Sequence, residues 1–397
     1  MDDVRSVAAS LVAGVFLGGV GGGVAFPTLP TLGTVLSISP AVVGVILSAN
    51  RFTRLLVNTP AGSILDRMGT RRPMIAGFAV QAMAPFGYIA GLHAPEWGLS
   101  SAGVFVAARV LWGVGSAFVF VGAFSTITHV TTPENRGKWT GYMRGGQSLG
   151  FPTGLVVGGL VTDAFGYDAA FAVAGSAGVV ATAVAAAVLP DLRADVDTVG
   201  LRELPGLLDD RRVGAVAGVN FLVRFLFAGV LLSTVVLYAS TNDIGLGSLS
   251  GVGASGVVMA ASVVAASVAT VLVGRYSDGV ANRASVTVPA LALLGGGFVV
   301  LALRPTLAGT MAGVVLVGLG VGGTNPPLLA YLGDISPAED VGKLGGAYNV
   351  FGDLGSTLGP LLALPLAADV GFLLGYLGCA ALVVVAAGLV VAALLGD

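Results

Sequence analysis

Several cationic and amide side chains lie inside apolar stretches of this sequence, where they could bind a polar solute. Arg51, Arg54 and Asn58 follow an apolar run that begins at Ala41, and their spacing places them on one side of a helix. A cation at membrane depth is costly unless it faces a protein-lined or water-filled interior. The three residues therefore predict a polar cavity rather than a lipid-facing surface.

Asp353 is the carboxylate that lies deepest within an apolar stretch. It is roughly 13 Å from the start of its predicted helix near Leu344. A carboxyl group at that depth holds its proton more tightly than one in water unless a cation is near. Asp353 is therefore predicted to carry a proton. The alternative is a salt bridge to an arginine, and both hold if the pair breaks during function.

Arg109 lies about ten residues from the outer end of its apolar stretch, too deep to reach the surface. One interpretation is a charge that lowers the proton affinity of a nearby carboxylate, or repels a proton, during coupling. The other is a structural arginine bonded to backbone carbonyls. Arg224 also lies near the middle of its stretch, and Asn325 precedes two prolines that predict a kink. The candidate binding residues are Arg51, Arg54, Asn58, Arg224, Asn325 and Asn349.

The elements that position these residues follow from composition. The chain has 397 residues, of which 55% are apolar and 10% charged, whereas soluble domains carry about a quarter charged residues. Runs of about 20 apolar residues predict membrane-spanning helices. The predicted spans are 6–33, 40–63, 73–93, 99–129, 138–162, 168–189, 213–239, 249–274, 284–303, 307–333, 344–367 and 371–395. The fold class is an all-α membrane protein of twelve transmembrane helices.

The polar connector 190–212 divides the spans into two six-helix halves, 1–189 and 213–397. With both termini in the cytoplasm, Arg304 is the basic loop residue left outside, so basic residues favour this orientation. The halves also repeat. Gly62, Asp66 and Arg67 after the second span are echoed by Gly274 and Asp278 after the eighth. The glycines of the fifth span, Gly141, Gly150 and Gly154, are echoed by Gly346, Gly355 and Gly359.

The chain resembles the major facilitator superfamily over essentially its whole length. The segment from Gly62 to Arg72 resembles the family's loop motif between helices two and three, with Thr70 where a basic residue is usual. Arg109 and Gly113 fit the fourth-helix motif, with Trp112 replacing a glutamine. The fifth-span glycines resemble an antiporter motif, although Leu155 stands where proline is expected. They are Gly141, Gly150, Gly154, Gly158 and Gly159.

The resemblance implies a gating role for the loop motif, through Gly62, Asp66, Arg67, Gly69, Arg71 and Arg72, with Gly274 and Asp278 as the second copy. The alternative is a plain basic turn. Asp66 can accept hydrogen bonds from a helix N-terminus or pair with an arginine. The glycine row predicts close packing against a partner helix, for which span eight or ten is expected.

The resemblance further implies a secondary transporter that moves a small organic solute by alternating access, with proton-coupled efflux as the first hypothesis. The alternative is proton-coupled uptake of an anionic metabolite, suggested by the excess of arginines within the spans. The substrate, the direction and a sodium alternative stay open. The expected partners are the solute, protons and the bilayer of the plasma membrane, and the expected state is a monomer.

Other classes of protein are disfavoured. Cys379 is single, and His93 and His129 are far apart, so no metal site or catalytic cluster is expected. No basic patch with interleaved aromatics suggests nucleic acid. The sequence therefore predicts no enzyme, no catalytic residue, no metal and no cofactor. A membrane sensor would need a signalling domain, for which the connector is too short.

Overall fold

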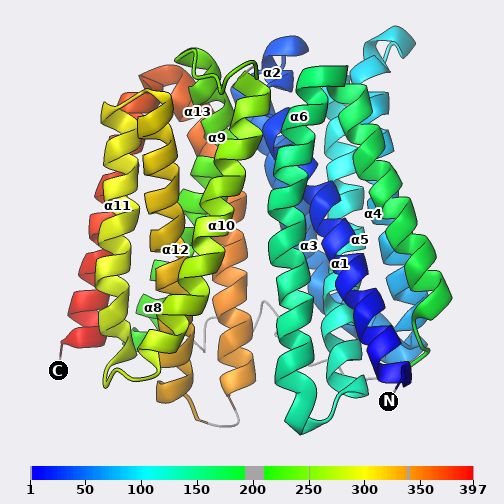
Figure 1. Cartoon of the computed structure of the whole chain (residues 1–397), viewed down its shortest axis with the longest axis vertical. Helices are drawn as coiled ribbons and strands as arrows, with labels where there is room; N and C mark the ends of the chain where they lie inside the picture. Colours follow the sequence, from blue (N-terminus) through cyan, green and yellow to red (C-terminus); the bar gives the residue numbers. More distant parts are fainter. Residues whose placement is uncertain (1, 193–209, 250, 338–339, 397) are drawn as a thin grey trace. The chain divides into compact units, whose positions relative to one another are not determined.

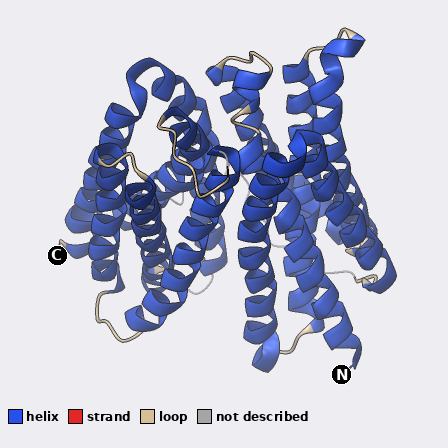
Figure 2. Cartoon of the chain, turned by 45° about the horizontal axis from the view of Figure 1, so that its top comes forward, coloured by secondary structure: helices blue, strands red, loops and turns tan. Residues whose placement is uncertain are grey.

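The computed structural model describes residues 2–192, 210–249, 251–337 and 340–396. Within these ranges the chain forms helices joined by loops and turns, with no β-sheet (Figure 2). Ten of the described helices are long and apolar enough to cross a membrane. The structure therefore agrees with an all-α membrane protein.

The chain divides into two compact units, Met1–Thr198 and Val199–Asp397. The boundary falls within the predicted connector 190–212, most of which lies outside the described residues. The first unit contains α1 (Asp2–Thr28), α2 (Leu32–Val35), α3 (Pro40–Met68), α4 (Arg71–His93), η1 (Ala94–Trp97), α5 (Ser101–Val130) and α6 (Pro133–Val188). The first predicted span is shorter than expected, because α1 ends at Thr28 and a turn leads into α2.

The second unit has the corresponding order of helices (Figure 1). It contains α8 (Arg211–Arg224), η2 (Phe225–Leu231), α9 (Leu232–Thr241), α10 (Gly251–Ser277), η3 (Arg283–Val286), α11 (Thr287–Leu303), α12 (Leu307–Ile335), α13 (Val341–Val390) and η4 (Val391–Leu395). The segment η2 is a π-helix that continues α8 without a loop. The helix α12 runs through Pro326 and Pro327 to Ile335.

Two helices are too long for one crossing and contain a glycine with non-helical backbone angles. Gly166 in α6 has φ 83° and ψ 176°, and Gly371 in α13 has φ 80° and ψ 167°. Glycine adopts such positive φ values without the steric cost that a Cβ would impose. Gly166 lies in the gap predicted between two spans, and Gly371 is the first residue of a predicted span. The ten described helices of membrane length therefore contain two internal breaks, at positions consistent with the twelve spans that the sequence predicts.

The glycine row of α6 packs against α1, which lies beside it in Figure 1. A Cβ built on Gly150 or Gly154 would collide with the carbonyl oxygen of Phe16 or Val20, respectively. A Cβ on Gly158 would lie 2.6 Å from the Cα of Val24. The glycines thus approach the first helix of their own half, whereas the expected contact with span eight or ten would join the two units and stays a prediction. The spacing of glycines along one helix predicts a face without side chains, but it does not identify the helix that packs against that face.

The five glycines of the predicted motif do not act alike. Gly159 is buried, whereas Gly141 is exposed and a Cβ there would meet nothing within 4 Å. Gly141 is therefore not part of the close contact. It lines an apolar hollow of about 530 Å³ between α1 and the start of α6.

The second unit repeats this contact between α13 and the α8–η2 helix. A Cβ on Gly355 would collide with the carbonyl oxygen of Phe221, and Gly359 meets the backbone of Gly229 in η2. Gly150 and Gly154 therefore have structural counterparts in Gly355 and Gly359, as the sequence repeat predicts. Both units therefore contain this backbone-to-backbone seam.

We predict that Gly154→Ala destabilises the protein, because the added methyl group meets the Val20 carbonyl and cannot be accommodated without a backbone shift. Overpacking of this kind costs about 1–3 kcal/mol. The matched control is Gly141→Ala, which adds the same methyl group to open space on the same helix. The measurement is the apparent melting temperature in detergent. Equal melting temperatures for the two variants would contradict the packing role of the seam.

Candidate functional site

Arg109 of α5 is almost fully buried, with 1% of its surface exposed, and it bonds to two neighbouring helices. Its Nε donates to the carbonyl oxygen of Ile46 at 3.2 Å, and its Nη2 donates to that of Leu47 at 3.1 Å. Nη2 also donates to Asn50 Oδ1 at 2.9 Å, and Nη1 donates to the Tyr88 hydroxyl at 3.4 Å. Arg109 therefore joins α5 to α3 and α4.

All four acceptors around Arg109 are neutral, and two of them are backbone carbonyls. This is the arrangement that the structural interpretation of Arg109 requires. Close helix contact makes it possible: a Cβ on Gly113, one turn further along α5, would lie 2.5 Å from the carbonyl oxygen of Asn50. The proton-coupling role of Arg109 stays a prediction.

Arg51, Arg54 and Asn58 share one side of α3 but meet different neighbours. The Arg51 guanidinium lies 5.3 Å from the ring centre of Phe26 in α1, and that of Arg54 lies 5.9 Å from the ring centre of Phe120 in α5. Cations are attracted to aromatic faces at such distances. The Asn58 Oδ1 is buried and has no hydrogen-bond partner among the described residues. It is therefore available to a solute or to water.

A polar cluster in the second unit surrounds the end of α8. The Tyr348 hydroxyl donates to Asn325 Oδ1 at 3.0 Å, and Asn220 Nδ2 donates to the carbonyl oxygen of Tyr348 at 2.6 Å. Gly352 completes the cluster, since a Cβ there would lie 2.9 Å from Asn220 Nδ2 and 3.2 Å from Arg224 Cγ. The structure thus places Arg224 and Asn325, both predicted binding residues, around one group of contacts.

Asn220 was not among the predicted residues, although a signal for it exists. It lies four residues before Arg224, so the two side chains share one face of α8. Arg224 is the last residue of α8, and the π-helix η2 begins directly after it at Phe225. Single π turns inside α-helices are frequent at functional sites, which adds weight to this cluster as a candidate site.

Asp353 and Asn349 lie one turn apart on α13, beside the cluster but on an adjacent face. Asp353 is half-buried and Asn349 is exposed. The backbone carbonyl of Asp353 accepts a hydrogen bond from Thr357 Oγ1 at 2.7 Å. Gly352, the residue before Asp353, contacts Asn220 and Arg224. A change in the charge of Asp353 is therefore expected to act close to the cluster.

The loop motif of the first unit is held by the end of α6. Gly69 has φ 80°, and a Cβ there would lie 2.5 Å from Asp191 Oδ1. The Thr70 backbone N–H donates to the Leu192 carbonyl at 2.8 Å, and Arg71 Nη2 donates to the Ala186 carbonyl at 2.9 Å. Of the other predicted gating residues, Gly62 is buried, Asp66 half-buried, and Arg67 and Arg72 exposed.

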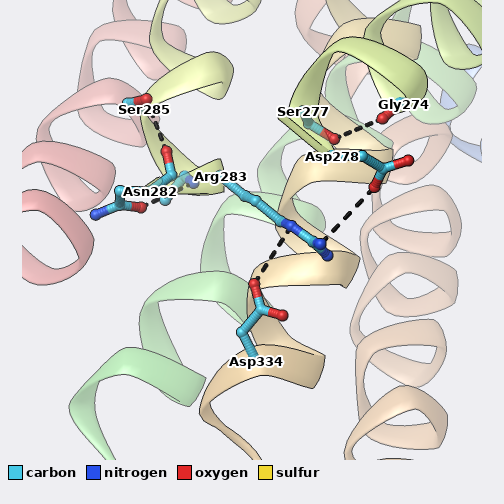
Figure 3. Close-up of polar contacts among 8 residues, drawn as sticks. Gly274, Ser277, Asp278, Asn282, Arg283, Ser285 and Asp334 are labelled. Carbon is cyan, nitrogen blue, oxygen red and sulfur yellow. Dashed lines mark hydrogen bonds and ion pairs between the residues drawn. The ribbon is translucent and has the colours of Figure 1, made fainter. Parts of the chain in front are cut away.

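The second copy of the motif contains an ionic link, shown in Figure 3. Arg283 Nη2 lies 3.8 Å from Asp278 Oδ1, and Arg283 Nε lies 3.4 Å from Asp334 Oδ2 at the end of α12. Gly274, one turn before Asp278, accepts a hydrogen bond from Ser277. Arg283 and Asp334 were missed by the sequence reasoning. The repeat offered a signal, because Arg283 follows Asp278 by the five residues that separate Arg71 from Asp66.

In the described part of the chain, no group of three or more His, Cys, Asp or Glu side chains is arranged to hold a metal ion. The two units instead present arginines, amides and hydroxyls. Such groups recognise a solute by hydrogen bonds and charge.

Comparison with known proteins gives one family. The family model described as Major Facilitator Superfamily matches residues 11–360. The chain is 22% identical over 371 residues to Multidrug resistance protein 2 of Bacillus subtilis, covering 91% of this chain and 89% of that protein. It is 29% identical over 167 residues to Multidrug resistance protein 1 of the same organism, which covers 41% of each chain.

Two solved structures share the fold. A bacterial homolog of the human lysosomal transporter Spinster, in an inward-facing and occupied conformation, matches with a TM-score of 0.78 and 15% identity, covering 98% of this chain and 96% of that one. A mutant form of the nucleoside transporter NupG matches with a TM-score of 0.80 and 13% identity, covering 97% of this chain and 99% of that one.

We predict that Arg109→Gln lowers the apparent melting temperature, because it removes the donors that join α5 to α3 and α4. An unpaired buried polar group costs about 1–3 kcal/mol. Arg144→Gln, on an exposed position of α6, is the control and should leave stability unchanged. If Arg109→Gln keeps its melting temperature and loses only proton-driven transport, the structural role is wrong and the coupling interpretation holds.

Proposed function

Because the chain belongs to the Major Facilitator Superfamily, we propose that it is a transporter that exports a small organic solute in exchange for protons. The observation that carries this proposal is the match to Multidrug resistance protein 2 over 91% of the chain. The antiporter-like glycine row and the carboxylate beside the second-unit cluster support it. The basic residues of the loops support cytoplasmic termini, and the proposal includes a monomer in the plasma membrane.

In the proposed mechanism each unit moves as a body. The seams between α1 and α6 and between α8–η2 and α13 are contacts of backbone on backbone, which resist bending. Close-packed elements shift between discrete arrangements rather than deforming continuously. Alternating access then requires a change between the units, with the loop motif around Asp66 acting as the gate.

Asp353 supplies the coupling. Its ionised form attracts a cationic solute or a neighbouring guanidinium, and its protonated form attracts neither. A proton arriving from outside therefore weakens the binding of a cationic solute, and release of that proton inside restores it. Asn220, Asn325 and Tyr348 provide the neutral hydrogen-bonding groups of the same site. This competition between proton and solute produces antiport.

The contacts of the arginines bear on the alternative, uptake of an anionic metabolite. Arg51 and Arg54 lie over aromatic rings, and Arg109 donates to neutral groups of its own unit. These arginines therefore do not require an anionic substrate. Arg224 remains the arginine at the polar cluster, and the alternative depends on it.

Replacing the coupling carboxylate provides one test. In liposomes, Asp353→Asn should abolish solute accumulation driven by a pH gradient, because the amide cannot bind and release a proton, while passive exchange of solute continues. Asp369→Asn, an exposed position on the same helix, should behave like the wild type. An Asp353→Asn protein that still concentrates solute against the pH gradient would remove Asp353 from the coupling step.

Ligand competition provides the other. Lipophilic organic cations should raise the apparent melting temperature of the purified protein, and organic anions should have little effect. Asp353→Asn should reduce the response to cations, because it removes the negative charge next to the cluster. Stabilisation by anions that Arg224→Gln abolishes and Arg144→Gln retains would instead establish the anionic alternative.

A further inference from the structure

A polar cavity of about 290 Å³ lies at one end of the second unit, away from the Arg224 cluster. It is bounded by the start of α8, the loop before η3, the end of α12 and the end of η4. Its polar lining consists of Arg212, Asn282, Arg283, Tyr331 and Asp334. None of these residues has a role in the proposed transport cycle.

Hydrogen bonds and ion pairs fix the walls of the cavity, and they do not use every N–H donor of Arg283. Asn282 Nδ2 donates to the Leu394 carbonyl at 3.1 Å, and Arg211 Nη2 donates to the Ala392 carbonyl at 3.0 Å, so both hold η4 in place. Arg283 is oriented by Asp278 and Asp334 through its Nη2 and Nε (Figure 3). A guanidinium carries five N–H donors in a planar fork, and Nη1 takes no part in these two ion pairs.

Charge favours an anion in this cavity. The lining contains two guanidinium groups and one carboxylate. Arg283 is already paired with Asp334 and, outside the lining, with Asp278, so Arg212 supplies the positive charge that favours an anion. The Arg212 side chain is exposed, and the described residues provide no carboxylate within ion-pair distance of it. Two arginines from separate elements that reach one cavity suit the oxygens of a phosphate, which accepts hydrogen bonds from planar guanidinium groups.

The position of the cavity favours a lipid as the source of that phosphate. Four membrane-length segments begin or end here, so the cavity lies where the helices leave the apolar layer. They are Arg211–Thr241, Arg283–Leu303, Leu307–Ile335 and Gly342–Leu395. Ile335, Leu394 and Leu395 complete its lining with apolar side chains. Basic pockets between helices at the cytoplasmic boundary bind anionic lipid headgroups, and the loop charges predict that this end is cytoplasmic.

We propose that this cavity binds the phosphodiester headgroup of an anionic phospholipid. Arg212 and Arg283 donate to the phosphate, Asn282 and Tyr331 supply further hydrogen-bonding groups, and the acyl chains lie along the adjacent helices. A bound headgroup would link α8, the η3 loop and α12. Anionic lipid therefore stabilises the second unit, whatever the direction or coupling of transport.

The test uses the full-length protein in neutral detergent at fixed ionic strength. Phosphatidylglycerol should raise the apparent melting temperature more than phosphatidylcholine with the same acyl chains. Arg212→Gln should weaken the apparent affinity for phosphatidylglycerol about tenfold or more, because it removes a charge-assisted hydrogen bond to the phosphate. The matched control is Arg275→Gln, an exposed arginine in the last turn of α10 that is not part of the lining.

Each other outcome overturns the proposal. If the two lipids raise the melting temperature equally, the arginines do not recognise the headgroup charge. If Arg212→Gln and Arg275→Gln lose the same affinity for phosphatidylglycerol, the effect is one of general surface charge. A separate arm adds inorganic phosphate alone. If that matches phosphatidylglycerol, the ligand is free phosphate and the lipid assignment is wrong. Arg212→Lys keeps the charge without the planar fork, so it should recover part of the affinity even if Arg212→Gln folds poorly.

Discussion

The close approach of backbone to backbone at the glycine seams is the constraint on which the other contacts depend. Helices in lipid gain no hydrophobic free energy by associating, so van der Waals contact at short range must hold them together. In the first unit the seam between α1 and α6 brings Phe26 within 5.3 Å of Phe151, ring centre to ring centre, and Arg51 rests over Phe26. In the second unit the seam brings α13 to α8, where Asn220 reaches the Tyr348 carbonyl. The polar groups are placed by the packing.

The two units repeat each other at the seam and differ next to it. In the first unit α1 is a regular α-helix along its contact with α6, whereas in the second the helix becomes π-helical from Phe225 to Leu231. Gly229, which meets Gly359, lies within that π-helical stretch. A π turn shifts the side chains that follow it relative to those before it. The difference begins directly after Arg224, so the two units share the seam and differ beside the polar cluster of the second unit.

The sequence predicted the helices and their packing faces better than it predicted which helix or acceptor group lies opposite each of them. Apolar run length and the gaps near Gly166 and Gly371 predicted where the long helices break, since both properties are local. The fifth-span glycines predicted a close contact but not that α1 makes it, because spacing along one helix carries no information about the helix opposite. The depth of Arg109 required a partner and left two possibilities open. Its actual acceptors, carbonyls of Ile46 and Leu47, depend on how α3 lies against α5, which no local pattern encodes.

The two copies of the loop motif have similar sequences but form different contacts. Arg71 binds a neutral carbonyl at the end of α6, and its loop is bonded through Thr70 to Leu192. Arg283, at the equivalent position, binds the carboxylates of Asp278 and Asp334. Bonds to carbonyls do not change with carboxylate protonation, whereas exposed ion pairs weaken as salt rises and are lost when the carboxylates are protonated. The second loop is therefore expected to be more sensitive to ionic conditions than the first. Although the motif is duplicated in sequence, its two copies are held by different kinds of bond.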